Sequence, residues 1–273
     1  MNYDHYFLVI EESDANFFEE LFEINEFNDY YIQNSLESKL ISLNIYIEEN
    51  KEVPDFLKSY ELIKKETSNL EEWQKKWKES LHEFTLCEGI KVFPLHEKKR
   101  VKDINKIGII PGFLFGTGLH ESTRLASVLL KKNIKEGDSV LDVGCGTGIL
   151  SVLSKKLGAD YVLGVDIEKN TREKVEEICW INDVDFEFRE SDFLKNIQKG
   201  EKFDIIVSNM IIQLINKFVL DLGDFLKEDG KIIITGILEE QSKDFENIVE
   251  EKYHIIERKV ENEWIGFLLK IKK

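Results

Sequence analysis

Runs of apolar residues alternate with amphipathic segments over the second half of the chain, and this rhythm predicts strands and helices in turn. Strands are predicted at 139–143, 161–166, 185–190, 203–208 and 231–236. Helices are predicted between them, near 148–157, 169–181, 211–227 and 238–250. Such alternation is typical of a parallel sheet with helices on both faces. The tail from Lys252 onward breaks the rhythm and predicts two strands joined by a short turn, a hairpin on the sheet.

The first part of the chain has a different pattern. Alternating or short apolar runs predict strands at 5–10, 28–33 and 40–47, and near-helical spacing of Phe and Leu predicts a helix at 14–25. A long helix is predicted from residue 55 to about 80, because Pro54 is tolerated at a helix start. The segment 86–112 reads as a connector. The sequence therefore predicts a small α+β domain at 1–88 followed by a larger α/β domain at 89–273.

Charge is distributed unevenly between these two parts. Of a formal net charge of −16, residues 1–88 contribute −13, from eight lysines against 21 acidic residues. Residues 89–273 are nearly balanced, with 29 basic and 32 acidic residues. An acidic first domain is a poor fit to the phosphate backbone of nucleic acid, so direct nucleic-acid binding is not expected. A basic protein partner and a simple solubility role both fit this charge.

Other features of the composition narrow the class of protein. The start of the chain lacks a basic segment, and its apolar run is too short for a signal peptide. No stretch approaches the roughly 20 apolar residues of a membrane span. The three cysteines, Cys87, Cys145 and Cys179, have no metal-ligand spacing, and a scattered odd number suits a reducing compartment. We expect a cytoplasmic protein with no membrane partner and no metal.

The segment VLDVGCGTG, residues 140–148, carries the strongest chemical signal. Its glycines follow a predicted strand with the spacing G-x-G-x-G, which is neither the dinucleotide fingerprint nor a phosphate-binding loop. Ligands of open α/β sheets bind at the carboxyl ends of the strands, where glycine lets the backbone approach them closely. Asp142 precedes the first glycine, and Asp166 ends the next predicted strand, where a carboxylate can accept hydrogen bonds from both hydroxyls of a ribose.

These residues resemble the first motifs of the class I S-adenosylmethionine-dependent methyltransferases. The resemblance implies a Rossmann-like, seven-stranded catalytic domain that uses S-adenosyl-L-methionine as its cofactor. It also implies that the glycine loop approaches the methionyl and ribose parts, that Asp166 holds the ribose, and that Asp192, in RESDF, lies near the adenine. The residues assigned to the cofactor through this motif are Asp142, Gly144, Gly146, Gly148, Asp166 and Asp192.

A narrower resemblance covers nearly the whole chain. FLFGTGLHESTRLASVLL, VSNMIIQLI and EEWQKKWKES followed by GIKVFP are similar to segments of the methyltransferases that modify large-subunit ribosomal protein eleven, the PrmA family. This implies a protein N-methyltransferase acting on lysine or N-terminal amines of a basic ribosomal protein, with a leading domain that captures the substrate. By position, Thr123, Gly144, Asp166 and Asn209 match the family's cofactor-contacting residues.

The sequence departs from the family pattern on the substrate side. Glu121 and Ser122 replace Pro-Thr after the histidine, Ser208 replaces Ala before Asn209, and Ile211-Ile212 replaces Leu-Ala. These changes leave two alternatives open. One is a class I methyltransferase acting on another protein amine, a small molecule or RNA. The other is a cofactor-binding regulatory protein without turnover.

The chemistry of methyl transfer to an amine places few demands on side chains. The sulfonium methyl is already activated, so the protein supplies alignment and a dry site. A lysine, with a pKa of about 10.4, must lose its proton before it attacks. We expect Asn209 to orient the amine as the catalytic residue and Thr123 to position the cofactor. His120 is expected to cap a helix rather than act as a base, and Trp73, Trp77 and Trp264 are expected to serve in packing.

Overall fold

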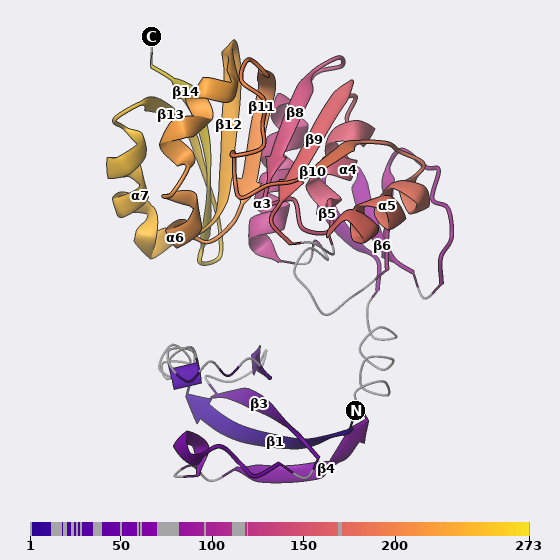
Figure 1. Cartoon of the computed structure of the whole chain (residues 1–273), viewed down its shortest axis with the longest axis vertical. Helices are drawn as coiled ribbons and strands as arrows, with labels where there is room; N and C mark the ends of the chain where they lie inside the picture. Colours follow the sequence, from indigo (N-terminus) through magenta and orange to yellow (C-terminus); the bar gives the residue numbers. More distant parts are fainter. Residues whose placement is uncertain are drawn as a thin grey trace. The chain divides into compact units, whose positions relative to one another are not determined.

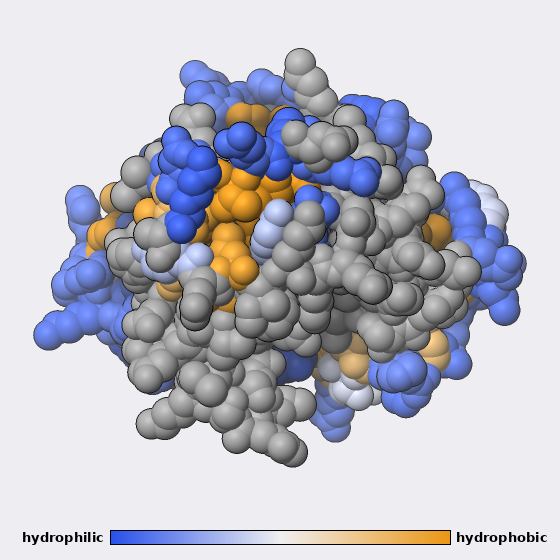
Figure 2. Space-filling view, turned by 90° about the horizontal axis from the view of Figure 1, so that it is seen from below, coloured by the Kyte–Doolittle hydropathy of each residue, from blue (hydrophilic) through white to orange (hydrophobic). Residues whose placement is uncertain are grey.

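The computed structural model describes residues 2–11, 18, 21–22, 25, 27, 29–34, 40–49, 51–58, 60, 62–69, 82–95, 97–110, 118, 120–168 and 171–272. The chain divides into two compact units, Met1–Ser80 and Leu81–Lys273 (Figure 1). In the described part, no helix is long and apolar enough to cross a membrane. Hydrophilic side chains border an apolar area on the face seen in Figure 2.

The first unit contains an antiparallel sheet with strand order β2-β3-β1-β4. Its strands are β1 (Asn2–Glu11), β2 (Tyr30–Asn34), β3 (Leu40–Glu48) and β4 (Ile63–Asn69). Alternate residues of β3, from Leu43 to Ile47, point to one face and pack with Phe18, Phe22 and Leu57. The strands predicted in 5–10, 28–33 and 40–47 are confirmed, and the described residues of the predicted helix at 14–25 are helical at Phe18, Leu21 and Phe22.

The long helix predicted from residue 55 to about 80 is wrong over its first half. A short 3-10 helix, η2 (Asp55–Leu57), follows Pro54, and residues 63–69 then form β4, which pairs antiparallel with β1. β4 lies at an edge of the sheet, where polar residues such as those of IKKETSN are tolerated in a strand. Pairing with β1 therefore overrides the local helical preference. Residues 70–81, including Trp73 and Trp77, lie outside the described residues.

The segment interpreted as a connector forms a small sheet that belongs to the second unit. Strands β5 (Phe84–Cys87) and β6 (Ile90–Pro94) are antiparallel, and β7 (Lys106–Ile109) runs parallel to β6. Leu86, Val92 and Ile107 are buried in the same core as the helices of the second unit. For this reason the boundary lies at Ser80 rather than at residue 88.

The second unit is built on a seven-stranded sheet with order β10-β9-β8-β11-β12-β14-β13. Its parallel strands are β8 (Ser139–Val143), β9 (Tyr161–Asp166), β10 (Glu187–Glu190), β11 (Phe203–Asn209) and β12 (Leu226–Leu238). The predicted hairpin is confirmed as β13 (Tyr253–Glu261) and β14 (Trp264–Ile271), with β14 antiparallel to β12. The strand order reverses between β8 and β11, and such a switch point is where open α/β sheets bind ligands.

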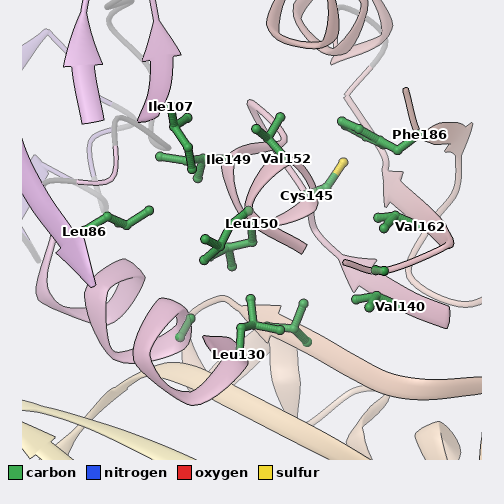
Figure 3. Packing of buried hydrophobic residues seen from close by; sticks show 14 of the residues in the cluster. Leu86, Ile107, Leu130, Val140, Cys145, Ile149, Leu150, Val152, Val162 and Phe186 are labelled. Carbon is green, nitrogen blue, oxygen red and sulfur yellow. The ribbon is translucent and has the colours of Figure 1, made fainter. Parts of the chain in front are cut away.

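Helices cover both faces of this sheet, as the alternation of strands and helices predicts. One core lies under α3 (Glu121–Asn133), α4 (Ile149–Lys156) and α5 (Thr171–Asn182), and Figure 3 shows side chains such as Leu130, Leu150 and Val140 meeting there. The other core lies under α6 (Ile212–Ile215), η3 (Val219–Phe225) and α7 (Ser242–Val249), which follows the short 3-10 helix η4 (Glu239–Gln241).

The helix predicted at 211–227 is instead two short elements, α6 and the 3-10 helix η3, and a buried tyrosine explains why η3 is not an α-helix. The Tyr253 hydroxyl accepts a hydrogen bond from Gly223 N–H at 2.9 Å and donates to the Val219 carbonyl, also at 2.9 Å. In an α-helix, Gly223 N–H and the Val219 carbonyl would bond to each other. Because the Tyr253 hydroxyl takes both partners, this turn does not continue as an α-helix.

A close backbone approach fixes the end of β11 against β12. Gly236 has φ +87°, and a Cβ atom there would lie 2.3 Å from the backbone oxygen of Met210. Met210 N–H in turn donates to the Thr235 carbonyl at 3.2 Å. A residue other than glycine at 236 would therefore force the two backbones apart just after Asn209.

We expect Gly236→Ala to destabilise the protein far more than Gly200→Ala. Both glycines have positive φ, so each substitution costs roughly 1–2 kcal/mol of backbone strain. Only Gly236 faces another backbone, whereas nothing lies within 4 Å of a Cβ at Gly200. Overpacking should add roughly 1–3 kcal/mol or more at Gly236. Chemical denaturation measures both free energies of unfolding, and equal losses in the two variants would contradict the close approach.

Candidate active site at the carboxyl ends of the parallel strands

The glycine loop connects β8 to α4 in a conformation that needs its glycines. Gly144, Gly146 and Gly148 have φ values of +74°, +52° and +82°, which side chains with a Cβ rarely adopt. A Cβ at Gly144 would lie 2.5 Å from Met210 Sδ, and one at Gly148 would lie 2.8 Å from the Phe186 ring. A Cβ at Gly146 would meet nothing within 4 Å. The outer two glycines thus allow packing, while the middle one faces open space.

Asp166, the last residue of β9, holds this loop with its carboxylate. Its Oδ2 accepts a hydrogen bond from Gly146 N–H at 2.8 Å, and its Oδ1 accepts one from Glu168 N–H at 3.0 Å. A carboxylate can accept about four hydrogen bonds, so two further donors can be bound. Gly146 and Asp166, which were both predicted to contact the cofactor, are therefore adjacent. Asp166 is part-exposed.

Asp142 lies beneath the loop and is 1% exposed. Its Oδ2 accepts a hydrogen bond from Ser151 Oγ at 2.6 Å, which joins β8 to α4. Burial raises the pKa of Asp142 to about 7, the Ser151 hydrogen bond opposes this rise, and the nearby charge of Asp166 adds to it. In this position the carboxylate supports the glycine loop from below.

Asn209 and Thr123 meet although 86 residues separate them in the sequence. Asn209 ends β11, and its Nδ2 donates a hydrogen bond at 3.1 Å to the hydroxyl of Thr123, in the first turn of α3. The next residue, Met210, packs its sulfur toward Gly144 of the glycine loop and its backbone against Gly236. The sequence analysis assigned no role to Met210, although Gly144 and Gly236 are residues that allow close packing at these strand ends.

His120 caps α3, as the sequence analysis expected. Its Nδ1 accepts a hydrogen bond from Ser122 N–H at 3.2 Å, and burial lowers its pKa. Its ring packs edge-on against Trp264, with ring centroids 4.5 Å apart. These contacts leave His120 and Trp264 with packing and capping roles.

Asp192 lies in the loop after β10, next to the end of β9. Its neighbour Ser191 donates its backbone N–H to the Asp166 carbonyl at 2.8 Å, and the Asp192 carboxylate pairs with Lys195.

Ile211 follows the Asn209–Met210 pair and is exposed, whereas Ile212 is buried in α6. Within the described residues, no group of three or more His, Cys, Asp or Glu side chains could hold a metal ion.

Comparison with known proteins identifies the family. A sequence model of the family described as "Ribosomal protein L11 methyltransferase (PrmA)" matches residues 7–272. The chain belongs to the PrmA family. The enzyme of that name from Thermotoga maritima is 35% identical over 275 residues, covering 99% of each chain. The one from Thermosipho africanus is 39% identical over 254 residues, 93% of this chain and 92% of the relative.

The fold agrees with a solved member of the same family. The crystal structure of ribosomal protein L11 methylase from Lactobacillus delbrueckii subsp. bulgaricus has a TM-score of 0.64 and 28% identity, and the match covers 71% of this chain and 100% of that one. The seven-stranded class I fold predicted from the sequence is thereby confirmed. The protein is an S-adenosylmethionine-dependent methyltransferase, as the PrmA family implies.

The residues present fit this cofactor. The open space over Gly146 admits a ligand close to the backbone, and the part-exposed Asp166 carboxylate beside it suits the two hydroxyls of a ribose. When bound, S-adenosylmethionine supplies a methyl group that is already activated for transfer. Asn209 and Thr123, on the neighbouring strand end and helix, are the polar groups that can orient its reacting end and the acceptor.

We expect Asp166→Ala to weaken S-adenosylmethionine binding by about tenfold or more. The variant loses one or two hydrogen bonds to a charged group, each worth roughly 1.5–3 kcal/mol. It also releases Gly146 N–H from its carboxylate partner. Isothermal titration calorimetry measures the affinity, with Asp192→Ala as a comparison on the adjacent loop. Unchanged affinity in Asp166→Ala would place the ribose elsewhere.

We expect Asp142 to make the stability of the ligand-free protein depend on pH. Its folded-state pKa of about 7 lies above the usual value of about 3.9 for an unfolded chain. The folded state therefore binds the proton more tightly, and this stabilisation is present below about pH 4 and lost as the pH rises to 7. Relative to Asp142→Asn, which does not titrate, the unsubstituted protein should lose up to roughly 4 kcal/mol over that interval.

Thermal and urea unfolding of the two proteins, measured between pH 4 and pH 8, tests this expectation. Taking the difference between them cancels the titration of all other groups. A difference that stays constant over this range, or that changes in the opposite direction, would show that Asp142 is ionised at neutral pH in the folded protein.

Proposed function

We propose that this protein methylates amines of ribosomal protein L11, at lysine side chains, the N-terminal amine or both. The curated relatives reported above carry the name ribosomal protein L11 methyltransferase and are matched over nearly their whole length. The observation that carries the proposal is the Asn209–Thr123 pair beside the glycine loop. An amide at this edge of the sheet supports an amine acceptor, because ligands of open α/β sheets bind at the carboxyl ends of the strands.

An amine acceptor suits the chemistry of Asn209. Its Nδ2 donates to Thr123, so its carbonyl oxygen can accept an N–H from an incoming neutral amine. A protonated lysine has no lone pair with which to attack, and desolvation at the site favours loss of its proton. Asn209 thus orients the nucleophile, while Thr123 fixes the amide and lies in the first turn of α3.

The acidic leading unit supports a basic protein as substrate. Residues Met1–Ser80 hold eight lysines and 19 acidic residues, a net charge of −11. Negative charge of this size attracts a lysine-rich surface and raises the rate of association, and salt screens this attraction. We therefore assign substrate capture to this unit and the reaction to the cytoplasm, where the thiols of Cys87, Cys145 and Cys179 stay reduced.

Mass spectrometry of L11 incubated with the protein and S-adenosylmethionine tests the proposal directly. Added methyl groups on lysine Nζ or on the N-terminal amine are the expected result. Unmodified L11, with methyl groups found instead on another added protein, a small molecule or RNA, would overturn the assignment of the substrate but not that of the fold.

We expect deletion of residues 1–80 to separate cofactor binding from substrate methylation. The deletion ends before β5, because that strand belongs to the second unit. The truncated protein should bind S-adenosylmethionine with unchanged affinity, since its sheet and glycine loop are complete, and its turnover on whole L11 should fall by about tenfold or more.

A salt series provides the control for electrostatic capture. Turnover of the full-length protein at low substrate concentration should fall as salt rises, because the Debye length shortens from about 10 Å at 0.1 M. The truncated protein should respond less. Equal activity of the two forms, or activity that ignores salt, would reduce the acidic unit to a solubility feature.

A further inference from the structure

Thr235, near the end of β12, carries a buried hydroxyl that the structure leaves unpaired. The residue is fully buried, and its Oγ has no hydrogen-bond partner among the described residues. A buried hydroxyl without a partner destabilises the folded state, and a valine of the same shape would avoid that loss. A β-branched residue suits the strand in either case. The hydroxyl is therefore not explained by packing.

The position of Thr235 in the sheet places it beside Asn209. The two residues are register partners in the parallel β11–β12 pair, so their side chains lie on the same face. That face is covered by α3, the helix that supplies Thr123. The glycine loop follows β8, on the other side of β11. Asn209 thus lies between the cofactor loop and Thr235.

Neighbouring contacts hold Thr235 in place. Its methyl carbon is the nearest atom to a Cβ built at Gly266 of β14, at 3.0 Å. Its carbonyl accepts the Met210 N–H at 3.2 Å. The Thr235 methyl group is therefore held by Gly266 of β14, and its backbone is held by Met210. The hydroxyl takes one of the other two positions on Cβ.

We propose that Thr235 is a positioning residue for methyl transfer, which holds the Asn209 amide so that its carbonyl oxygen faces the acceptor amine. An amide nitrogen has two N–H donors. Thr123 receives one of them, and the Thr235 hydroxyl receives the other when the amide turns to meet the acceptor. When both N–H groups of the Asn209 amide are hydrogen-bonded, the amide has a single orientation, and its carbonyl oxygen then points toward the acceptor amine. This inference rests on the acceptor-orienting role proposed above for Asn209.

The test compares Thr235→Val, Thr235→Ser and Asn209→Ala in the full-length protein. Thr235→Val should melt at a higher temperature than the unsubstituted ligand-free protein, because a methyl group replaces an unpaired buried hydroxyl. Its affinity for S-adenosylmethionine should stay within about twofold. Its kcat on L11 should fall by about tenfold or more with little change in KM, because only the oriented reaction step is affected. Thr235→Ser, which keeps the hydroxyl, should recover most of kcat.

Each outcome has a distinct meaning. Unchanged kcat in Thr235→Val, or a lower melting temperature, would overturn the role of the hydroxyl. If Asn209→Ala loses turnover while Thr235→Val keeps it, this inference fails and the proposed function stands. If Asn209→Ala keeps full turnover on L11, the proposed role of Asn209 fails together with the inference. Should Thr235→Val not fold, Thr235→Ala against Thr235→Ser gives the same comparison of kcat.

Discussion

The close packing of Met210 between Gly144 and Gly236 is the contact on which the active site depends. Met210 directly follows β11. Its sulfur lies toward Gly144, just after β8, and its backbone lies against Gly236 of β12. Since the contact with Gly236 is between backbone atoms, the end of β11, and with it Asn209, is held closely against β12. Backbone packing of this kind is stiffer than side-chain packing, which suits a reaction that needs alignment more than acid–base chemistry.

Asp142, beneath the glycine loop, and Asp166, beside it, make different contacts. Asp142 is buried and bonded to Ser151, and Asp166 is part-exposed and bonded to Gly146 N–H. Burial is the main reason that the pKa of Asp142 is raised, and the nearby charge of Asp166 adds to the rise. The Asp166 carboxylate is part-exposed, so it can accept further hydrogen bonds from a ligand.

The sequence predicted the central part of the fold well because buried parallel strands are long apolar runs with few alternatives. Strands β8 and β9 begin and end where they were predicted. The failures have a common cause, which is that pairing between distant segments overrides local pattern. β4 is a polar edge strand made by pairing with β1, and η3 is kept from forming an α-helix by the hydroxyl of Tyr253, 30 residues away from Gly223. The pair Asn209–Thr123 follows from motif positions, whereas Met210 and Thr235 become visible only when the strand ends are placed together.

The position of β14 has a consequence for the order in which the protein forms during synthesis. Residues 264–271 enter the sheet between β12 and β13, both of which are made earlier. Gly266 of this strand packs on Thr235, beside Asn209. Until β14 pairs with β12, the side of Thr235 that faces Gly266 is uncovered. Domains generally fold as units while the chain is made, so the surroundings of Asn209 are complete only after residues 264–271 have been made and have joined the sheet.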